Sequence, residues 1–216
     1  MSDQPTKEKI FSKLKRAFFN SSDATEPKFS EPVEPEEDCT NDSTEVTFAK
    51  NFTKRGGKFV FCIDKDEFAE LFRTLIVDKG WIKIHCMEEN LKTFLSEQGV
   101  AYVENVDFTH ESVTFTTCEF LGAKDGCAIF SSNQAVNTRM TNTTTTHVVM
   151  AYTSQVIDNT REAYRKIISK YFNQTPPTVY TYKGKPLDSE DSITMQNQAS
   201  TEKKEIYLFL IDDTEQ

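Results

Sequence analysis

The stretch KFVFCIDKDEFAELFRTLIVDKGWIKIHC, residues 58–86, contains a complete strand–helix–strand unit. Residues 58–63 form a short apolar run of strand length, and residues 81–86 form a second one. Between them, residues 66–77 place large apolar side chains at helical spacing on one face. A strand followed by a helix and another strand is typical of a parallel sheet with helices on its faces. This stretch therefore predicts an α/β protein.

The same alternation continues on both sides of this stretch. Residues 46–55 predict a helix that ends at a Gly-Gly pair. The further predicted elements are helices over residues 88–97 and 154–172 and strands over residues 100–103, 112–118, 127–130, 147–152, 178–182 and 206–211. Thr153 or Ser154 is expected to cap the longer helix. The two strands on either side of a turn at residues 121–126 are expected to form a hairpin-like pair.

The strand predicted at residues 206–211 indicates how the sheet is covered. Its residues are apolar without a break, which is typical of strands that are buried on both faces in α/β proteins. We therefore expect an open, mainly parallel sheet with helices on both of its faces. Residues 46–216 form the domain that contains this sheet.

Two segments of different character precede the α/β domain. Residues 1–20 contain apolar residues at helical spacing with Lys and Arg opposite them, and predict an amphipathic helix. It is expected to pack on the domain or on a partner subunit, and a membrane surface is the alternative. Residues 21–45 hold nine Asp or Glu residues against one Lys, together with three prolines. This composition predicts an acidic linker, because it cannot bury enough apolar surface to offset its ordering entropy.

Composition and charge exclude several classes of protein. The chain has 216 residues, a formal net charge of -9 and no apolar run near the ~18 residues of a membrane span. A chain this acidic is not expected to bind nucleic acid, and no signal peptide is expected at its start. The five cysteines are odd in number and include no Cys-x-x-Cys pair, which indicates reduced core thiols in a cytoplasmic protein.

Motifs for the common chemistries are missing from the sequence. The first predicted strand is followed by Asp64 and acidic neighbours, not by the glycines of a phosphate-binding loop. The three histidines, His85, His110 and His147, have no partner at the spacing of a metal site. No serine nucleophile elbow is present. We therefore expect no metal centre and no cofactor, and we lean away from an enzyme.

One segment, residues 116–132 with the sequence TTCEFLGAKDGCAIFSS, resembles the lactate-utilization (LUD) domain family in its C-subunit-like branch. Members of this family have a strand with a Thr-x-Cys/Ala-Glu/Asp tail and a glycine turn into the next strand. An Arg-containing loop and a His-Val/Ile strand follow, matched here by Arg139 and by residues 147–155. The resemblance spans roughly residues 46–213 and is greatest to the short, single-domain bacterial versions.

The resemblance implies both a fold and a functional setting. The fold is similar to that of the sugar-phosphate isomerase and CoA-transferase superfamily, an open and mainly parallel sheet with helices on both faces. The setting is the oxidation of lactate to pyruvate alongside iron–sulfur subunits. A fold of this kind hosts many activities, so the resemblance does not by itself assign one.

The chain departs from the family pattern at three turns. Asp125-Gly126-Cys127 stands where the family has Thr-Gly-Thr/Ser, so a carboxylate and a thiol replace two hydroxyls that can bind an anion. Two glycine-containing turns of the family are replaced by residues 183–189 and by residues 199–203. Glycines of that kind let a backbone approach a ligand closely. Together these changes indicate an altered pocket.

Four residues that the resemblance marks are retained, and we assign them to one crevice. Arg139 is the expected anion partner, through its planar guanidinium. Glu119 is the candidate general acid or base. His147 is expected to line the crevice and to form hydrogen bonds there, and Gly126 belongs to the turn. The structural alternative is that Glu119 caps a turn, Gly126 supplies a positive φ and Arg139 pairs with a carboxylate.

Two functional hypotheses remain open. The first is a divergent lactate-utilization-type protein that acts as a non-catalytic or regulatory accessory component in lactate oxidation. Its partners are iron–sulfur subunits, or the chain associates with itself. The alternative is an enzyme or binder that acts on a small carboxylate or a phosphate or CoA ester in the strand-end crevice. The altered turns favour the first hypothesis, and the retained residues support the second.

Overall fold

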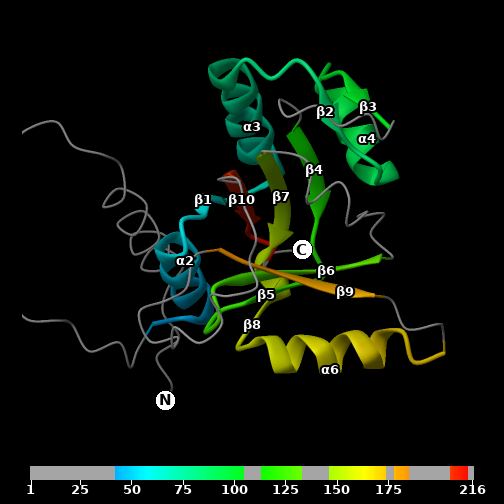
Figure 1. Ribbon diagram of the computed structural model, residues 1–216. Helices are drawn as coiled ribbons and strands as arrows, with labels where there is room; N and C mark the ends of the chain where they lie inside the picture. Colours follow the sequence, from blue (N-terminus) through cyan, green and yellow to red (C-terminus); the bar gives the residue numbers. More distant parts are fainter. Residues whose placement is uncertain (1–41, 105–112, 133–145, 174–177, 185–204, 214–216) are drawn as a thin grey trace, which may run out of the picture.

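A six-stranded parallel sheet runs through the centre of the protein (Figure 1). The computed structural model describes residues 42–104, 113–132, 146–173, 178–184 and 205–213. The predicted helix over residues 1–20, most of the acidic linker and Arg139 lie outside these ranges. None of the helices in the described ranges is long and apolar enough to cross a membrane.

The strand order of this central sheet is β1-β10-β7-β4-β2-β3, and every neighbouring pair is parallel. Its strands are β1 (Lys58–Cys62), β2 (Ile84–His85), β3 (Tyr102–Val103), β4 (Val113–Thr117), β7 (Thr146–Tyr152) and β10 (Glu205–Ile211). The α/β prediction, with an open and mainly parallel sheet, is therefore confirmed. The interior strand β10 alternates its apolar side chains between the two faces, so both faces must be covered.

Two helices, α3 (Lys65–Lys79) and α4 (Glu89–Glu97), cover one face of the central sheet (Figure 1). The Asp64 side chain begins α3 by accepting a hydrogen bond from the Glu67 N–H at 2.8 Å. Gly80 ends α3 in the left-handed region, with φ of 64°, which costs glycine little. The acidic residues that follow the first predicted strand thus form the start of a helix.

The opposite face is covered by α2 (Thr44–Lys54) and by a second, four-stranded sheet. The second sheet has the order β8-β5-β6-β9, and its strands are β5 (Phe120–Gly122), β6 (Cys127–Ser131), β8 (Val156–Ile157) and β9 (Val179–Lys183). Helix α6 (Thr160–Lys170) lies on its outer side, so the layers follow the order helix, sheet, sheet, helix (Figure 1). This second sheet was not anticipated by the sequence analysis.

The expected pairing of the strands at residues 112–118 and 127–130 is wrong. Strand β6 pairs antiparallel with β5, which occupies residues assigned to a turn, and the tight turn is only residues 123–126. Strand β4 has both of its edges filled by β2 and β7 in the central sheet. It therefore has no free edge for β6, and the chain passes from one sheet to the other between Thr117 and Phe120.

The long helix predicted over residues 154–172 is shorter at its start. Thr153–Gln155 form a single 3-10 turn, and Val156 pairs with Leu121 as part of β8. Asn159 caps α6 by accepting from the Glu162 N–H at 3.1 Å. The hydroxyls of Thr153 and Ser154 instead donate to Asp213, so neither is available as the cap.

Phenylalanines fill the core between the central sheet and α3. Phe68 and Phe72 of α3 and Phe94 of α4 contact Phe115 of β4 and Phe209 of β10, and the Phe72 and Phe115 rings stack with centroids 4.8 Å apart. Aromatic pairs in such arrangements add to the stabilisation that comes from area burial alone. The packing between α3 and the central sheet therefore depends on aromatic rings from four elements.

We predict that Phe115→Ala lowers the free energy of unfolding by about 3–5 kcal/mol, because the ring is fully buried and the surrounding phenylalanines cannot fill its volume. Urea unfolding followed by circular dichroism measures the change. Ile82→Ala is the control, since the Ile82 side chain is 83% exposed. Equal losses in the two variants would contradict the role of the aromatic core.

Candidate functional site

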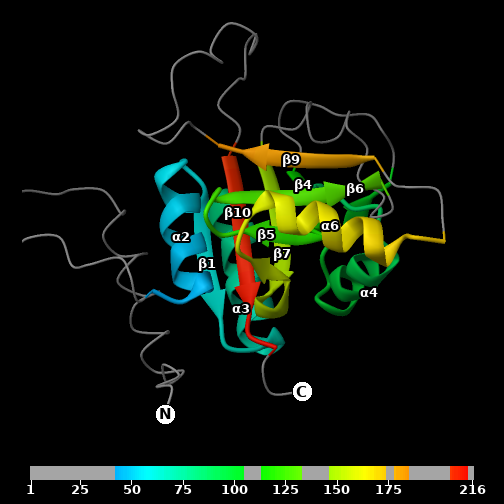
Figure 2. The ribbon, with the colours of Figure 1, turned by 90° about the horizontal axis from the view of Figure 1, so that it is seen from below.

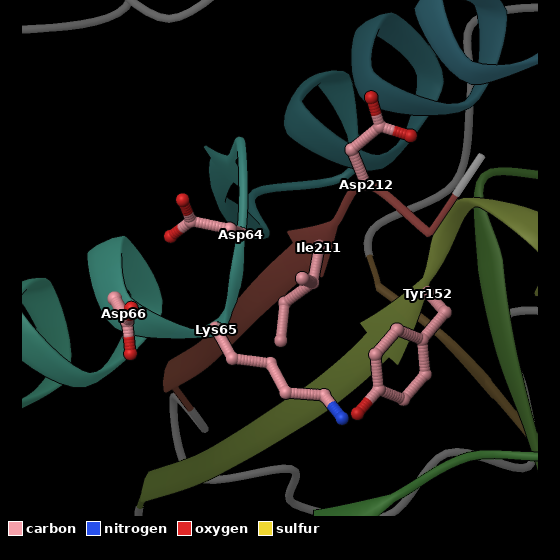
Figure 3. A pocket seen from close by; sticks show the side chains of 6 residues that line it. All are labelled: Asp64, Lys65, Asp66, Tyr152, Ile211 and Asp212. Atoms are coloured by element: carbon pink, nitrogen blue, oxygen red, sulfur yellow. The ribbon is translucent and has the colours of Figure 1, made fainter. Parts of the chain in front are cut away.

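The carboxyl ends of β1, β7 and β10 meet at a small pocket of about 190 Å³ (Figure 3). Its lining consists of Asp64, Lys65, Asp66, Tyr152, Ile211 and Asp212. This edge of a parallel sheet is where α/β proteins bind ligands. The Lys65 side chain extends toward Tyr152, and its ammonium lies 5.8 Å from the centre of that ring (Figure 3).

The charge of this pocket opposes an anionic ligand. Three carboxylates line it against one ammonium group. Asp64 is engaged as the cap of α3, and next to the pocket the Asp213 carboxylate accepts from the Ser154 N–H and hydroxyl at 3.0 and 2.6 Å. Lactate, pyruvate and phosphate esters are all negatively charged, so this lining repels them rather than holding them.

The candidate acid or base, Glu119, follows the carboxyl end of β4 and is held by three donors. Its carboxylate accepts from the Ser131 hydroxyl at 2.7 Å, the Tyr171 hydroxyl at 2.8 Å and the Lys170 ammonium at 2.8 Å. Only 2% of the side chain is exposed. Burial alone would raise the pKa of Glu119, but these hydrogen bonds, led by that of Lys170, hold the pKa below its usual value. The carboxylate thus links β6 and the end of α6 to the end of β4.

A second carboxylate, Glu88, was missed by the sequence analysis. It follows β2, the parallel neighbour of β4, and accepts from the Thr117 N–H at 2.8 Å and the Thr117 hydroxyl at 2.6 Å. Burial raises the pKa of Glu88 above its usual value; the bonds from Thr117 offset part of this rise, and the nearby charge of Glu119 adds to it. An acid two or three residues after the end of each of two neighbouring strands is the signal that marks this pair.

Two carboxylates whose pKa values are shifted in opposite directions are the arrangement that acid–base catalysis uses. Here, however, Glu88 and Glu119 each bind groups of the chain itself. Glu88 fixes the end of β4, and Glu119 joins the second sheet to α6. Their described contacts are those of structural carboxylates.

Gly126 fits its turn tightly against α2. Its φ is 56°, and a Cβ atom there would come within 2.6 Å of the carbonyl carbon of Asn51. The turn is also hydrogen-bonded to this helix, because the Asn51 side-chain amide donates to the Ala123 carbonyl at 2.9 Å and the Arg55 guanidinium donates to the Asp125 carbonyl at 2.6 Å. Only glycine satisfies both the backbone conformation and the close approach.

Asp125 brings its carboxylate to the start of α6. One oxygen accepts from the Thr160 N–H at 2.7 Å and from the Thr160 hydroxyl at 2.5 Å, and Lys183 lies 3.9 Å from the other. Burial opposes ionisation, but the bonds from Thr160 outweigh it and hold the pKa of Asp125 below its usual value. The first turn of a helix favours a negative charge. In this chain an internal carboxylate supplies it.

His147 lies near the amino end of β7, between the two sheets. Its Nε2 is 2.8 Å from the Thr116 hydroxyl oxygen, and its ring stacks on Phe130 of β6 with centroids 5.4 Å apart. The residue is buried. Tyr152, at the pocket, is at the other end of the same strand. His147 therefore lies away from the edge at which ligands of α/β proteins bind.

The structure does not bring the three described candidates into one crevice. Glu119 faces α6 on the outer side of the second sheet, His147 lies between the sheets, and Gly126 contacts α2. Gly126 has the positive φ of the structural alternative, whereas the Glu119 carboxylate binds three side chains instead of capping a turn. Because Arg139 falls outside the described residues, the four-residue crevice stays a prediction.

No cluster of metal-ligating side chains occurs among the residues that the structure describes. The four cysteines in these ranges, Cys62, Cys86, Cys118 and Cys127, are buried and form no disulfide. Burial raises the pKa of the Cys62 and Cys86 thiols to about 12, so these thiols stay protonated at neutral pH. Such thiols serve as small apolar side chains of the core.

The chain shares its fold with a structurally known protein. A DUF162 family protein from Deinococcus radiodurans superposes with a TM-score of 0.57 over 78% of this chain and 96% of that chain, at 8% sequence identity. Neither a protein-family model nor a curated protein matches the sequence. At this identity the likeness concerns the fold alone. The chain therefore has an α/β fold similar to that of this DUF162 family protein.

We predict that Gly126→Ala lowers the free energy of unfolding by more than the roughly 1 kcal/mol that a positive φ costs an alanine. The added methyl group would also collide with the backbone of α2. Gly80→Ala is the matched control, because Gly80 has a φ of 64° but no atom within 4 Å of the added Cβ position. If both variants lose equal stability in urea unfolding, the close packing of the turn on α2 is unimportant.

We predict that Glu119→Gln lowers the free energy of unfolding by about 2 kcal/mol at pH 7, the typical value of a hydrogen-bonded charge. Since the folded pKa of Glu119 is depressed, its stabilisation is present above the unfolded pKa and is lost as the pH falls through the folded pKa. The difference between wild type and variant should therefore shrink below about pH 4. Urea titrations at several pH values measure it.

Glu162→Gln is the control for this pH series. Glu162 pairs with Lys166 at 3.3 Å on the surface of α6, and such exposed pairs contribute little. A Glu119→Gln variant as stable as Glu162→Gln at pH 7 would contradict the anchoring role of Glu119.

Proposed function

We propose that this chain is a divergent lactate-utilization-type protein that acts in the cytoplasm as a non-catalytic or regulatory accessory component of lactate oxidation. The observation that carries the proposal is the Asp125 carboxylate at the start of α6. The resemblance expects anion-binding hydroxyls in this turn, and the chain instead places its own anion there. A substrate anion that approached the same helix start would meet a negative charge.

The engagement of Glu119 supports the same proposal. A general acid or base must reach the proton that it transfers. With three donors on its carboxylate and 2% of its side chain exposed, Glu119 has no oxygen directed to a substrate. The acidic lining of the strand-end pocket adds a further obstacle to lactate and pyruvate.

The partners proposed for the accessory role are iron–sulfur subunits. The predicted amphipathic helix over residues 1–20 and the acidic linker that follows it suit docking to such a subunit, because an amphipathic helix binds by placing its apolar face in a groove. The four buried cysteines of the described residues are compatible with the reducing conditions of a cytoplasm.

The pocket at the ends of β1, β7 and β10 supports a second candidate function. An enzyme or binder of a small carboxylate, or of a phosphate or CoA ester, would use this pocket, where Lys65 is the cation nearest to Tyr152. Three carboxylates in the lining weigh against this candidate, so it ranks second.

We predict that L-lactate, pyruvate, CoA esters and sugar phosphates leave the melting temperature of the protein unchanged in a thermal-shift series. A true ligand at 100 times its Kd would add ~2.7 kcal/mol. For a chain of this size this corresponds to a rise of roughly 5–10 °C. A saturable rise that is lost in Lys65→Ala would overturn the non-catalytic proposal in favour of the strand-end binder.

The accessory role is tested by affinity purification of the tagged chain from its native cells, followed by mass spectrometry. We expect iron–sulfur subunits to be recovered, and we expect deletion of residues 1–20 to weaken their recovery. Recovery of the chain alone, from cells that are growing on lactate, would contradict the accessory role.

A further inference from the structure

The outer surface of α6 carries a row of apolar side chains. Tyr164 and Ile168 are one helical step of four residues apart, and Phe172 lies four residues further on, just past the end of the helix. Their side chains are 38%, 64% and 81% exposed. Ala163 and Ile167 fill the opposite side of the helix against the second sheet. Large exposed apolar groups in a row are typical of a surface that contacts another segment or protein. We call these three residues the α6 row.

Two arginines lie along the α6 row. Successive helical residues are rotated by about 100°, so Arg161 and Arg165 share a face with Tyr164 and Ile168. Both arginines are exposed, and neither is ion-paired with a carboxylate of the described residues. The surface that they form with the α6 row is both apolar and positively charged. It fits an occupant with apolar side chains among carboxylates.

A second copy of α6 is not a suitable occupant, because it presents arginines instead of carboxylates and the arginines of the two copies would repel each other. The chain does contain a segment with the required composition. Residues 26–38, EPKFSEPVEPEED, hold six acidic residues and one lysine around Phe29 and Val33, and they lie outside the described residues. The charge of this segment complements that of the α6 surface.

The spacing of the apolar groups also agrees. Three prolines in residues 26–38 favour an extended backbone, in which Phe29 and Val33 would be about 12 Å apart. From Tyr164 to Phe172 the rise of a helix gives a similar separation, about 12 Å. Two apolar side chains of the segment thus match the length of the α6 row.

The described part of the chain begins on the side of the molecule where α6 begins. Helix α2 packs against β8, which leads into α6, and Figures 1 and 2 place the start of α2 on the same side of the molecule as the start of α6. Asp42 is nine positions after Val33 in the sequence, a stretch that spans up to about 30 Å when extended. A covalent connection of this length gives millimolar effective concentrations, so a weak contact suffices.

We propose that residues 26–38 bind along the outer face of α6, with Phe29 and Val33 on the α6 row and the glutamates against Arg161 and Arg165. The segment then covers this face within one molecule. The inference does not depend on the proposed role in lactate oxidation.

Chymotrypsin cleavage after Phe29 tests the proposal on the full chain, with the rate at this bond followed by mass spectrometry. We expect the double variant Arg161→Glu/Arg165→Glu to raise the rate about three- to tenfold, because two surface ion pairs are lost. Arg73→Glu on α3 is the matched control and should leave the rate unchanged. Phe172→Ala should also raise it, and since this side chain is exposed the fold is not at risk.

Reversing the charge of residues 26–38 should restore the contact that the arginine variant loses. Glu31→Lys/Glu34→Lys/Glu36→Lys in the Arg161→Glu/Arg165→Glu background should restore the slow cleavage seen in the wild type. Equal rates after Phe29 in the wild type, the arginine variant and the rescue variant would overturn the proposal. So would protection that increases with protein concentration, because it would assign the contact to a second copy of the chain. Loss of binding to phosphatidylserine vesicles in the arginine variant, with unchanged cleavage, would overturn it in favour of a membrane surface.

Discussion

The burial of both faces of the central sheet is the constraint on which the other layers depend. Strand β10 lies between β1 and β7 and sends Leu208 to one face and Phe209 to the other. A parallel sheet of this kind is stable only when neither face meets water. Helices α3 and α4 cover the first face. On the second, α2 covers only part, and the four-stranded sheet completes the cover. The added sheet then has an outer face of its own, which α6 buries.

Two carboxylates fix these outer layers in place. Glu119 joins the end of β4 to β6 and α6, and Asp125 joins the turn after β5 to the start of α6. Both occupy positions that the family resemblance assigned to a ligand crevice. Within this chain they bind internal donors, so the groups that suggest a site also hold the second sheet and its helix together. Because these carboxylates are occupied by internal donors, they support the proposal of an accessory role over a catalytic one.

Much of the central sheet could be predicted from the sequence, because its strands are apolar runs and α3 has a clear helical face. In the second sheet, β6 and β9 could be predicted as strands, but the two short strands and the sheet that the four strands form could not. Phe120–Gly122 is too short to show any periodicity, and Val156-Ile157 reads as part of the helix that follows it. For the site, the sequence identified Glu119 but not its donors Ser131, Lys170 and Tyr171, since these are brought to it by tertiary packing. His147 was correctly placed at the start of its strand, but its assignment to a ligand crevice did not take into account that ligands of parallel sheets bind at the carboxyl ends of the strands.

The position of β10 has a consequence for how the protein is made. Lys58 pairs with Tyr207, so the first and the final strands of the sheet in chain order are neighbours. During synthesis, β1 and β7 emerge from the ribosome well before the strand that fills the space between them. Until residues 205–211 arrive, both strands expose an unpaired edge and apolar faces, which is the condition under which chains aggregate or recruit chaperones. A nascent chain that stalls just short of β10 would lack an interior strand, so β1 would have no neighbour in the sheet.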